Sequence, residues 1–207
     1  LTLMRASAEV AQRRSHDDPQ QTELMQDIVL EVDHMSQLVD DLLLLSRLDA
    51  NQLKMEKQPI FIPDLIEEIK RQFMPFTAER QITLVNQTSS GSALADLTRL
   101  RQVIIILLDN AIKHTLDGGI ITIQSSVEGR NLRISVSDNG EGIPPQHLGH
   151  IFERFYQAES VRSSNSKGTG LGLSIAKSLV EAQEGQIRIT SQPGSGTNVS
   201  INLPLWK

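Results

Sequence analysis

The sequence predicts an α+β protein in which a helical hairpin comes first and a mixed β-sheet with helices on one face follows. The first observation is an apolar stripe between Leu24 and Leu48, whose members recur at intervals of three and four residues. The second is a change in the pattern of apolar residues at residues 52–59, after which short strand-like runs alternate with helical patterns. Because strands are indicated only after this change, the hairpin and the sheet are expected in separate domains.

The hairpin is predicted from two amphipathic segments and the break between them. Residues 1–14 carry apolar side chains at helical spacing, and residues 15–19 interrupt this pattern. Asp18 followed by Pro19 favours a helix start, because aspartate caps free N–H groups and proline lacks the N–H that would stay unpaired. The second helix then carries the stripe, which consists of Leu24, Ile28, Val32, Met35, Val39, Leu42, Leu45 and Leu48.

An apolar stripe of this length is typical of a coiled coil or a four-helix bundle. If the stripe fills the inside of the hairpin, a second apolar set on the same helix is left uncovered: Met25, Val29, Leu38, Leu43 and Leu44. A second copy of the chain would cover that set, so we expect a homodimer built on a four-helix bundle. The alternative is a hairpin that packs only on the globular part of its own chain.

Residues 1–56 are assigned to the hairpin and residues 57–207 to a globular domain. Strands are expected over residues 59–62, 82–85, 120–127, 132–137, 186–190 and 198–203. Helices are expected from Pro63 onward and over residues 97–115, 145–152 and 171–182. The apolar side of the helix that begins at Pro63 is expected to carry Leu65, Ile66, Ile69, Phe73 and Phe76. Residues 160–167 are polar and nearly devoid of apolar anchors, which predicts a mobile loop.

Composition excludes several kinds of chemistry. The 207 residues include no cysteine, so disulfides, thiolate chemistry and cysteine-bound zinc are ruled out. The formal net charge is -5 with both signs mixed along the chain, so no nucleic-acid binding is expected. The longest strictly apolar run, Val103–Leu108, is far shorter than the roughly 20 residues that cross a bilayer. Since the sequence opens at Leu1 within a helical pattern, we expect a fragment of a longer protein.

A binding site is predicted where the strand over residues 132–137 ends, at Asp138-Asn139-Gly140-Glu141-Gly142. A carboxylate at the end of a strand, followed by two glycines, points into a cleft, and the missing side chains let a flat ligand approach the backbone. Asp138 would accept a hydrogen bond from an exocyclic amine such as that of adenine. The same residues also form an ordinary turn sequence, so the prediction depends on the other segments of the site.

Two other segments are expected to bind the phosphates of a nucleotide. Asn110 and Lys113 share one face of the helix over residues 97–115, where an amide oxygen and an ammonium group suit hydrated Mg²⁺ and the phosphates that it bridges. Residues 168–172 place three glycines at the start of the next helix. The backbone N–H groups that such glycines expose, together with the positive end of the helix, favour anionic phosphate.

These segments, taken with Ile151–Tyr156 and Pro193–Thr197, stand in the order of the sequence boxes of bacterial sensor histidine kinases. The chain resembles that family over nearly its whole length, since residues 38–48 are similar to the end of the family's dimerisation hairpin. The resemblance implies a dimerisation and histidine-phosphotransfer hairpin followed by a Bergerat-type ATP-binding domain, the fold shared with gyrase, Hsp90 and MutL. It also implies ATP and Mg²⁺ as cofactors, a homodimer joined through the hairpin, and the receiver domain of a response regulator as partner.

The resemblance assigns roles to particular residues. Asp138 would read adenine, Asn110 would hold Mg²⁺ and Lys113 would reach phosphate, which makes Asn110 and Lys113 the expected catalytic residues. Thr197 would support Asp138, and residues 160–167 would form a lid over ATP. The expected nucleotide-binding set is Asn110, Lys113, His114, Asp138, Gly140, Gly142, Lys167, Gly168, Thr169, Gly170, Leu171, Gly172 and Thr197.

The sequence departs from the family pattern in two places. In the family, the phosphoaccepting histidine lies directly before a Leu-Thr pair similar to Leu1-Thr2, so the expected acceptor lies upstream of the sequence given, and no other histidine is assigned to replace it. Ile106, one helical turn before Asn110, occupies the position where sensor kinases usually carry asparagine. An isoleucine cannot bind the metal, so we expect a slow but competent kinase.

The leading hypothesis is therefore a kinase core that phosphorylates the upstream histidine from Mg-ATP and passes the phosphoryl group to a response-regulator aspartate. The alternative suggested by Ile106 is a pseudokinase that binds nucleotide and signals by conformation. A gyrase-type or Hsp90-type ATPase is disfavoured by the helical hairpin and by the missing catalytic glutamate. We expect this chain to be a cytoplasmic portion, with the full-length protein anchored in the inner membrane through segments outside it.

Overall fold

The computed structural model describes residues 19–157 and 169–206. The chain divides into two compact units, with the division between Ala50 and Asn51. The boundary that we predicted between residues 56 and 57 lies slightly further along, where the first strand begins. None of the helices in the described ranges combines the length and the apolar character that a membrane crossing needs.

In the first unit the structure describes one long helix, α2 (Pro19–Asp49). The segment expected to form the first helix and the proposed cap Asp18 lie outside the described residues. The apolar stripe was predicted to be the covered side of α2, and this is wrong for most of its length. Only two of its members, Val32 and Leu45, are buried, whereas five are exposed by 39% to 56%: Leu24, Ile28, Met35, Val39 and Leu42.

The second apolar set on α2 behaves differently from the prediction as well. Met25, Val29, Leu38 and Leu44 are half-buried, and only Leu43 of that set is exposed. The physical reason is that a helical period defines an apolar side without specifying which partner covers it. The exposed apolar surface of α2 therefore comprises five members of the stripe together with Leu30 and Leu43.

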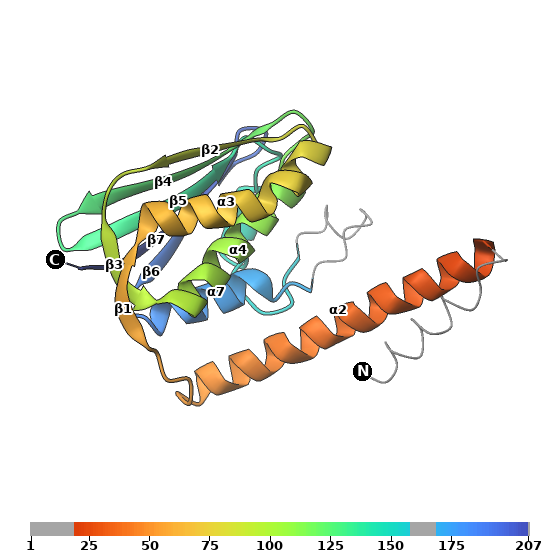
Figure 1. Cartoon of the computed structure of the whole chain (residues 1–207), viewed down its shortest axis with the longest axis horizontal. Helices are drawn as coiled ribbons and strands as arrows, with labels where there is room; N and C mark the ends of the chain where they lie inside the picture. Colours follow the sequence, from red (N-terminus) through yellow and green to blue (C-terminus); the bar gives the residue numbers. More distant parts are fainter. Residues whose placement is uncertain (1–18, 158–168, 207) are drawn as a thin grey trace. The chain divides into compact units, whose positions relative to one another are not determined.

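The second unit contains a seven-stranded sheet and its helices (Figure 1). Its strands are β1 (Lys57–Phe61), β2 (Thr83–Thr88), β3 (Ser92–Asp96), β4 (Ile120–Glu128), β5 (Asn131–Asp138), β6 (Gln186–Gln192) and β7 (Gly196–Trp206). Its described helices are α3 (Ile62–Glu79), α4 (Leu97–His114), α5 (Pro145–Leu148) and α7 (Gly172–Glu181). The strand order is β1-β3-β7-β5-β4-β2, with β6 also paired to β7.

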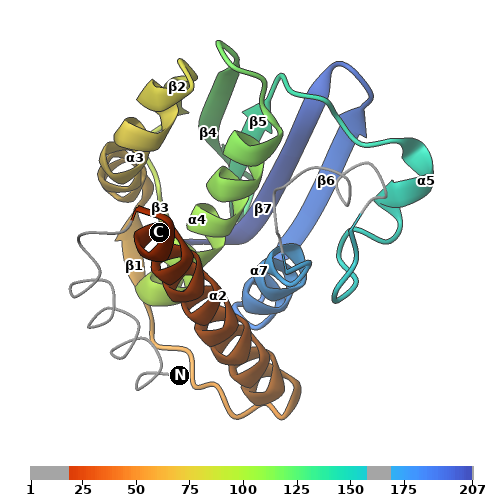
Figure 2. The ribbon, with the colours of Figure 1, turned by 90° about the vertical axis from the view of Figure 1, so that its right-hand side faces the viewer.

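The sheet is mixed, because β2 pairs with β4 in parallel while the other described pairings are antiparallel. Figures 1 and 2 show α3, α4 and α7 together on one face of this sheet. The predicted α+β class, with a mixed sheet and helices on one face, is confirmed for this unit.

The core lies between the sheet and these three helices. The strands contribute alternate residues to it, such as Ile121 and Ile123 of β4, each of which is fully buried. The helices contribute side chains at helical spacing, such as Ile104 and Leu108 of α4, which are also fully buried. The packed face of α4 fixes the direction of its other face, which carries Asn110.

Three local predictions need correction. Strand β3 was not predicted, because its buried residues Ala93 and Ala95 are small and have little strand preference. Helix α5 is shorter than the predicted 145–152, since it ends at Leu148. Phe76, expected on the apolar side of α3, is 61% exposed, because the inward row of the last turn continues to the buried Thr77 instead.

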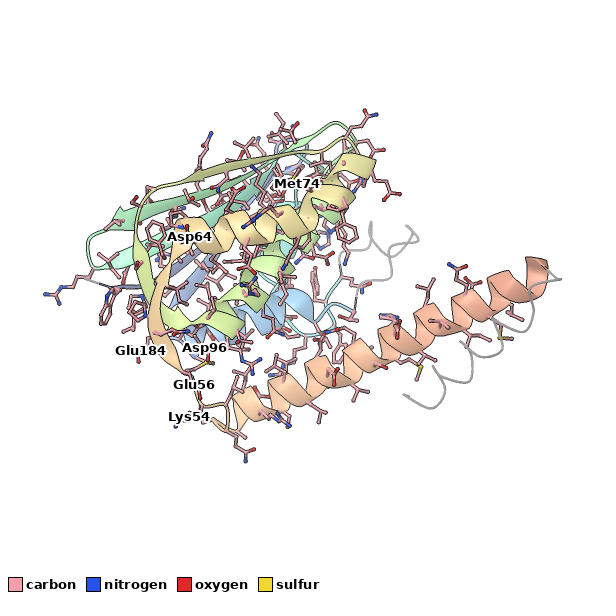
Figure 3. The ribbon with its side chains drawn as sticks, in the orientation of Figure 1. Lys54, Glu56, Asp64, Met74, Asp96 and Glu184 are labelled. Atoms are coloured by element: carbon pink, nitrogen blue, oxygen red, sulfur yellow. The ribbon has the colours of Figure 1, made fainter. Side chains whose placement is uncertain are left out.

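One junction fixes the start of α4 to the segment that enters this unit. The carboxylate of Asp96 accepts from the backbone N–H of Arg99 (3.1 Å) at Oδ1, which caps α4, and from the N–H of Glu56 (3.0 Å) at Oδ2. The backbone N–H of Asp96 itself donates to Oε1 of the fully buried Gln183 (2.9 Å). Figure 3 shows Asp96, Glu56 and Glu184 at the same corner of the unit.

Candidate functional site

Asp138 is the last residue of β5, and backbone N–H groups bind one of its two carboxylate oxygens. Oδ1 of Asp138 accepts hydrogen bonds from the backbone N–H groups of Gly140 (2.9 Å) and Thr197 (3.2 Å). Both of these donors bind Oδ1, which leaves Oδ2 to accept a hydrogen bond from a ligand. The end of β5 thus presents a half-buried carboxylate with one oxygen fixed by the backbone.

The electrostatic surroundings raise the pKa of the Asp138 carboxyl above its ordinary value. The main cause is burial, which disfavours the charged form. The N–H donors of Gly140 and Thr197 and the nearby His114 act in the opposite direction without offsetting it. A carboxylate that is already partly desolvated gains more from a donor on a ligand than an exposed one would.

The loop that follows β5 packs tightly against two other segments. A Cβ atom at Gly140 would overlap the carbonyl oxygen of His114, and one at Gly142 would overlap the carbonyl oxygen of Gln192. Gly142 also has φ +71°, a conformation that favours glycine. The N–H of Glu141 donates to the carbonyl of His114 (3.2 Å), which joins the loop to the end of α4. Figure 2 shows the end of α4, the segment after β5 and the β6–β7 turn at the same end of the sheet.

Ser191, on β6, was not singled out from the sequence, although it connects several segments around Asp138. Its Oγ accepts from the N–H of Ile143 (2.8 Å) and donates to the carbonyl of Gly196 (2.8 Å). The same oxygen lies 2.9 Å from Oγ1 of Thr197. Its place just before the Pro193–Thr197 sequence box was the signal in the sequence that could have found it.

Asn110, Lys113 and His114 lie on the last turns of α4. The side chain of Asn110 is half-buried and makes no hydrogen bond with the described residues. Nζ of Lys113 lies 2.5 Å from Oδ2 of Asp109, in an exposed ion pair that was not predicted. The imidazole of His114 is close enough to Asp138 to influence its pKa electrostatically. The structure therefore brings His114 to the neighbourhood of Asp138, and Lys113 on the same turn is paired with Asp109.

The C-terminal end of α4 is held by Arg80, another residue that the sequence analysis did not identify. Its guanidinium donates to the carbonyls of Ile112 (2.5 Å) and Thr115 (2.8 Å) and to the carboxylate of Asp117 (2.9 Å). A cation at this position compensates the free carbonyls at the end of a helix. No sequence signal indicates this contact, because Arg80 lies far from α4 along the chain.

Only part of the second glycine cluster is described. Oγ1 of Thr169 accepts from the N–H of Leu171 (3.2 Å), and Leu171 is fully buried. Gly170 has φ +70°, and its carbonyl accepts from the N–H of Phe155 (3.0 Å). Phe155 has φ +62°, which is uncommon for a residue other than glycine. The hydrogen bond between Phe155 and Gly170 thus connects the backbone that precedes residue 158 with the backbone that follows residue 168.

Gly172 begins α7 and faces α4. A Cβ atom there would lie 3.3 Å from Cγ2 of Ile106, so the two helices approach closely at this glycine. Lys167, Gly168 and the expected lid over residues 160–167 lie outside the described residues. Among the described residues, no group of three or more His, Asp or Glu side chains is arranged to hold a metal ion.

With this geometry in place, comparison with known proteins identifies the family. Residues 95–207 match the family described as histidine kinase-, DNA gyrase B- and HSP90-like ATPase, which covers more than half of the chain. The chain therefore belongs to this family. Residues 1–51 match the His Kinase A (phospho-acceptor) domain. The two matches together define the catalytic core of a two-component sensor histidine kinase, as the sequence motifs predicted.

Curated relatives agree with this assignment. The autoinducer 2 sensor kinase/phosphatase LuxQ of Vibrio cholerae is 37% identical over 84% of this chain and 21% of its own length. The alginate biosynthesis sensor protein KinB of Pseudomonas aeruginosa is 33% identical over 91% of this chain and 31% of its own length. The chain thus spans about a fifth to a third of the length of these relatives.

A solved structure of full-length ShkA in complex with AMPPNP resembles the whole chain. The TM-score is 0.82 and the sequences are 28% identical, with 99% of this chain and 43% of ShkA covered. The resemblance therefore extends over the fold of both units.

Proposed function

We propose that this chain binds Mg-ATP at the Asp138 pocket and transfers the γ-phosphoryl group to a histidine just upstream of Leu1. From there, the group passes to an aspartate in the receiver domain of a response regulator. The observation that carries the proposal is the half-buried carboxylate of Asp138, with Oδ1 fixed by two backbone N–H groups and Oδ2 left to a ligand. The AMPPNP bound by ShkA, an analogue of ATP, supports the choice of nucleotide.

The adenine base is proposed to lie beside the loop after β5. Its exocyclic amine would donate to Oδ2 of Asp138, a charge-assisted hydrogen bond in a partly desolvated site. Gly140 and Gly142 let this loop pack directly against the backbone of His114 and Gln192, which fixes the loop beside which the ring would lie. Thr197 supports this arrangement through the N–H that it donates to Asp138.

The phosphates are proposed to lie between α4 and the start of α7. Asn110 fits a magnesium site because its amide is half-buried and without a hydrogen bond to the described residues. The bound Mg²⁺ would neutralise charge that develops on the transferred phosphoryl group. Lys113 and His114 follow on the same helix, and the glycine cluster from Lys167 to Gly172 would supply backbone N–H groups, with Thr169 and Leu171 shaping its turn.

Ile106 is proposed to slow this reaction without abolishing it. It contributes an apolar methyl group near Gly172 at a place where an amide would be a second metal ligand. Magnesium retains several waters when proteins bind it, so one protein ligand fewer still permits binding. Phosphoryl transfer depends on positioning and charge compensation, and its rate is therefore the quantity that we expect Ile106 to lower.

The first unit is proposed to join two copies of the chain into a four-helix bundle. The exposed stripe on α2 supports this, because isolated apolar rows of this kind rarely remain uncovered. The same bundle would carry the acceptor histidine and bind the receiver domain of the response regulator. We further propose that the full-length protein is anchored in the membrane through segments outside this chain, which leaves this core in the cytoplasm.

The proposal is tested with the chain extended upstream through the expected histidine and incubated with Mg²⁺ and ATP labelled on the γ-phosphate. We expect label on the protein that is labile in acid, stable in base and lost when that histidine is replaced. Asp138→Asn should also abolish labelling, whereas Asp64→Asn, an exposed position on α3, should leave it unchanged. If ATP binds but no label appears, the protein is instead a pseudokinase, the alternative that Ile106 suggests.

A further inference from the structure

We propose that Ser191 is a positioning residue which makes the base pocket offer hydrogen-bond acceptors only, and that it thereby selects adenine nucleotides over guanine nucleotides. This inference rests on the proposed function, because it assigns base specificity to the same pocket. It gives a role to the side chain that connects β6, the loop after β5 and the start of β7.

The first step follows from the single proton of the Ser191 hydroxyl. A carbonyl oxygen can only accept, so Ser191 must donate this proton to the carbonyl of Gly196 (2.8 Å). The backbone N–H of Ile143 can only donate, so the Ser191 oxygen accepts from it (2.8 Å). The proton of Ser191 is therefore fully engaged within the protein.

The hydroxyl of Thr197 lies beside that of Ser191, with 2.9 Å between Oγ1 of Thr197 and Oγ of Ser191. Because the proton of Ser191 is already donated elsewhere, Thr197 must be the donor in this pair. The Thr197 hydroxyl then retains only lone pairs for a further partner. Thr197 is half-buried and directly beside Asp138, to whose Oδ1 its own N–H donates.

Oδ2 of Asp138 and Oγ1 of Thr197 are both acceptors, so this part of the pocket suits a base edge that carries an amine. Adenine presents an exocyclic amine at the position where guanine presents a carbonyl oxygen. A carbonyl placed against two acceptors would lose its hydration without gaining a hydrogen bond, which is a strong basis for discrimination.

Without Ser191, the proton of Thr197 is no longer directed away from the pocket. The Thr197 hydroxyl could rotate and donate to the carbonyl of guanine. We therefore expect Ser191→Ala to weaken ATP binding and to strengthen GTP binding relative to it. Because the change amounts to one neutral hydrogen bond, the preference for ATP over GTP should fall by roughly 3- to 10-fold.

The experiment measures the dissociation constants of ATP and GTP, each with Mg²⁺, for the whole chain by calorimetry. The variants are Ser191→Ala, Ser191→Thr and Thr197→Val, together with the double variant Ser191→Ala/Thr197→Val. Ser191→Thr keeps the hydroxyl and should retain the selectivity of the unmodified chain. In the Thr197→Val background, Ser191→Ala should have no further effect on selectivity, because it acts through the Thr197 hydroxyl.

The outcomes separate this inference from the proposed function. If the unmodified chain fails to bind ATP, the proposed function is wrong and the inference falls with it. If ATP binds but the ratio of the two constants is the same in Ser191→Ala, Ser191 does not set specificity. Should Ser191→Ala fail to fold, Thr197→Val decides, since unchanged selectivity without the Thr197 hydroxyl would also overturn the inference.

Discussion

The Cγ2 methyl of Ile106 lies against Gly172, where a Cβ atom would approach it to 3.3 Å. This contact joins the middle of α4 to the first residue of α7, on the side of α4 where Asn110 lies one turn further on. An apolar side chain thus occupies a position from which an amide would reach toward the proposed phosphate site.

Replacing Ile106 by asparagine should raise the rate of autophosphorylation. A second amide on this face would add a ligand for the metal. Because even groups that only orient metal ligands change metal affinity or activity by about tenfold or more, we expect a gain of at least that order. The rate of label incorporation in the upstream-extended chain measures the effect. Ile106→Ala is the control, because it removes the Cγ2 methyl that faces Gly172 without adding a ligand. An equal gain in both variants, or none in either, would contradict the role assigned to Ile106.

Gly142→Ala should weaken ATP binding by at least about tenfold and destabilise the domain by about 1–3 kcal/mol. The residue has φ +71°, and an added Cβ would overlap the carbonyl of Gln192, so the loop after β5 would have to move. Calorimetric titration with ATP and thermal unfolding measure the two effects. Gly149→Ala provides the control, since a Cβ at Gly149 meets nothing within 4 Å and φ there is -69°. Comparable losses in both variants would show that the geometry at Gly142 is not the cause.

Asp138→Asn should stabilise the free domain at neutral pH while abolishing ATP binding. Burial raises the folded-state pKa of Asp138, so the charged carboxylate costs folding free energy at pH values above that pKa. The folded state takes up the proton before the unfolded state as the pH falls, and the cost is fully relieved below the unfolded value near 3.8. The asparagine oxygen can still accept from Gly140 and Thr197, which preserves the loop.

The measurement is thermal unfolding of both proteins between neutral pH and pH 4. The stabilisation of Asp138→Asn should be largest at neutral pH and should shrink as the pH approaches the unfolded pKa of aspartate. A difference between the two proteins that does not vary with pH would mean that burial of the charge is not its origin.

Asp96→Ala should lower the free energy of unfolding by about 1–2 kcal/mol, the usual cost of removing a helix cap. The variant loses the acceptor for the N–H of Arg99 and also the acceptor for the N–H of Glu56. Chemical denaturation measures the change. Glu184→Gln is a control at the same corner, because the salt bridge of Glu184 with Lys57 has a largely exposed carboxylate and should be worth little. If Asp96→Ala is no more destabilising than Glu184→Gln, the cap contributes less than proposed.

The layout of the second unit was largely predictable because its elements carry strong periodic patterns. The helix expected over residues 97–115 is α4, and the strand expected to end before Asp138 is β5. Both contribute buried side chains at regular spacing, which is the signal that sequence patterns report best. Strand β3 lacked that signal, since its inward residues are alanines.

Contacts between distant segments could not be predicted in the same way. Nothing near Arg80 in the sequence indicates that its guanidinium binds the end of α4. The ion pair of Lys113 with Asp109 is different, because the two residues are four apart on one helix and their spacing could have indicated it. The hydroxyl of Ser191 gains its importance only when the β6–β7 turn folds against the loop after β5. The sequence motifs predicted which kinds of side chain the candidate site contains. The hydrogen bonds that orient those side chains could be seen only in the tertiary structure.

The junction at Asp96 has a consequence for building chimeric kinases from hairpins and ATP-binding domains of different origin. One carboxylate serves two purposes there, since it caps α4 with one oxygen and receives the backbone of Glu56 with the other. A foreign hairpin joined to the second unit at or before Asn51 would retain this shared anchor. A graft placed after Glu56 would separate the incoming segment from the helix that carries Asn110, so the choice of splice site decides whether the recombined protein inherits the connection.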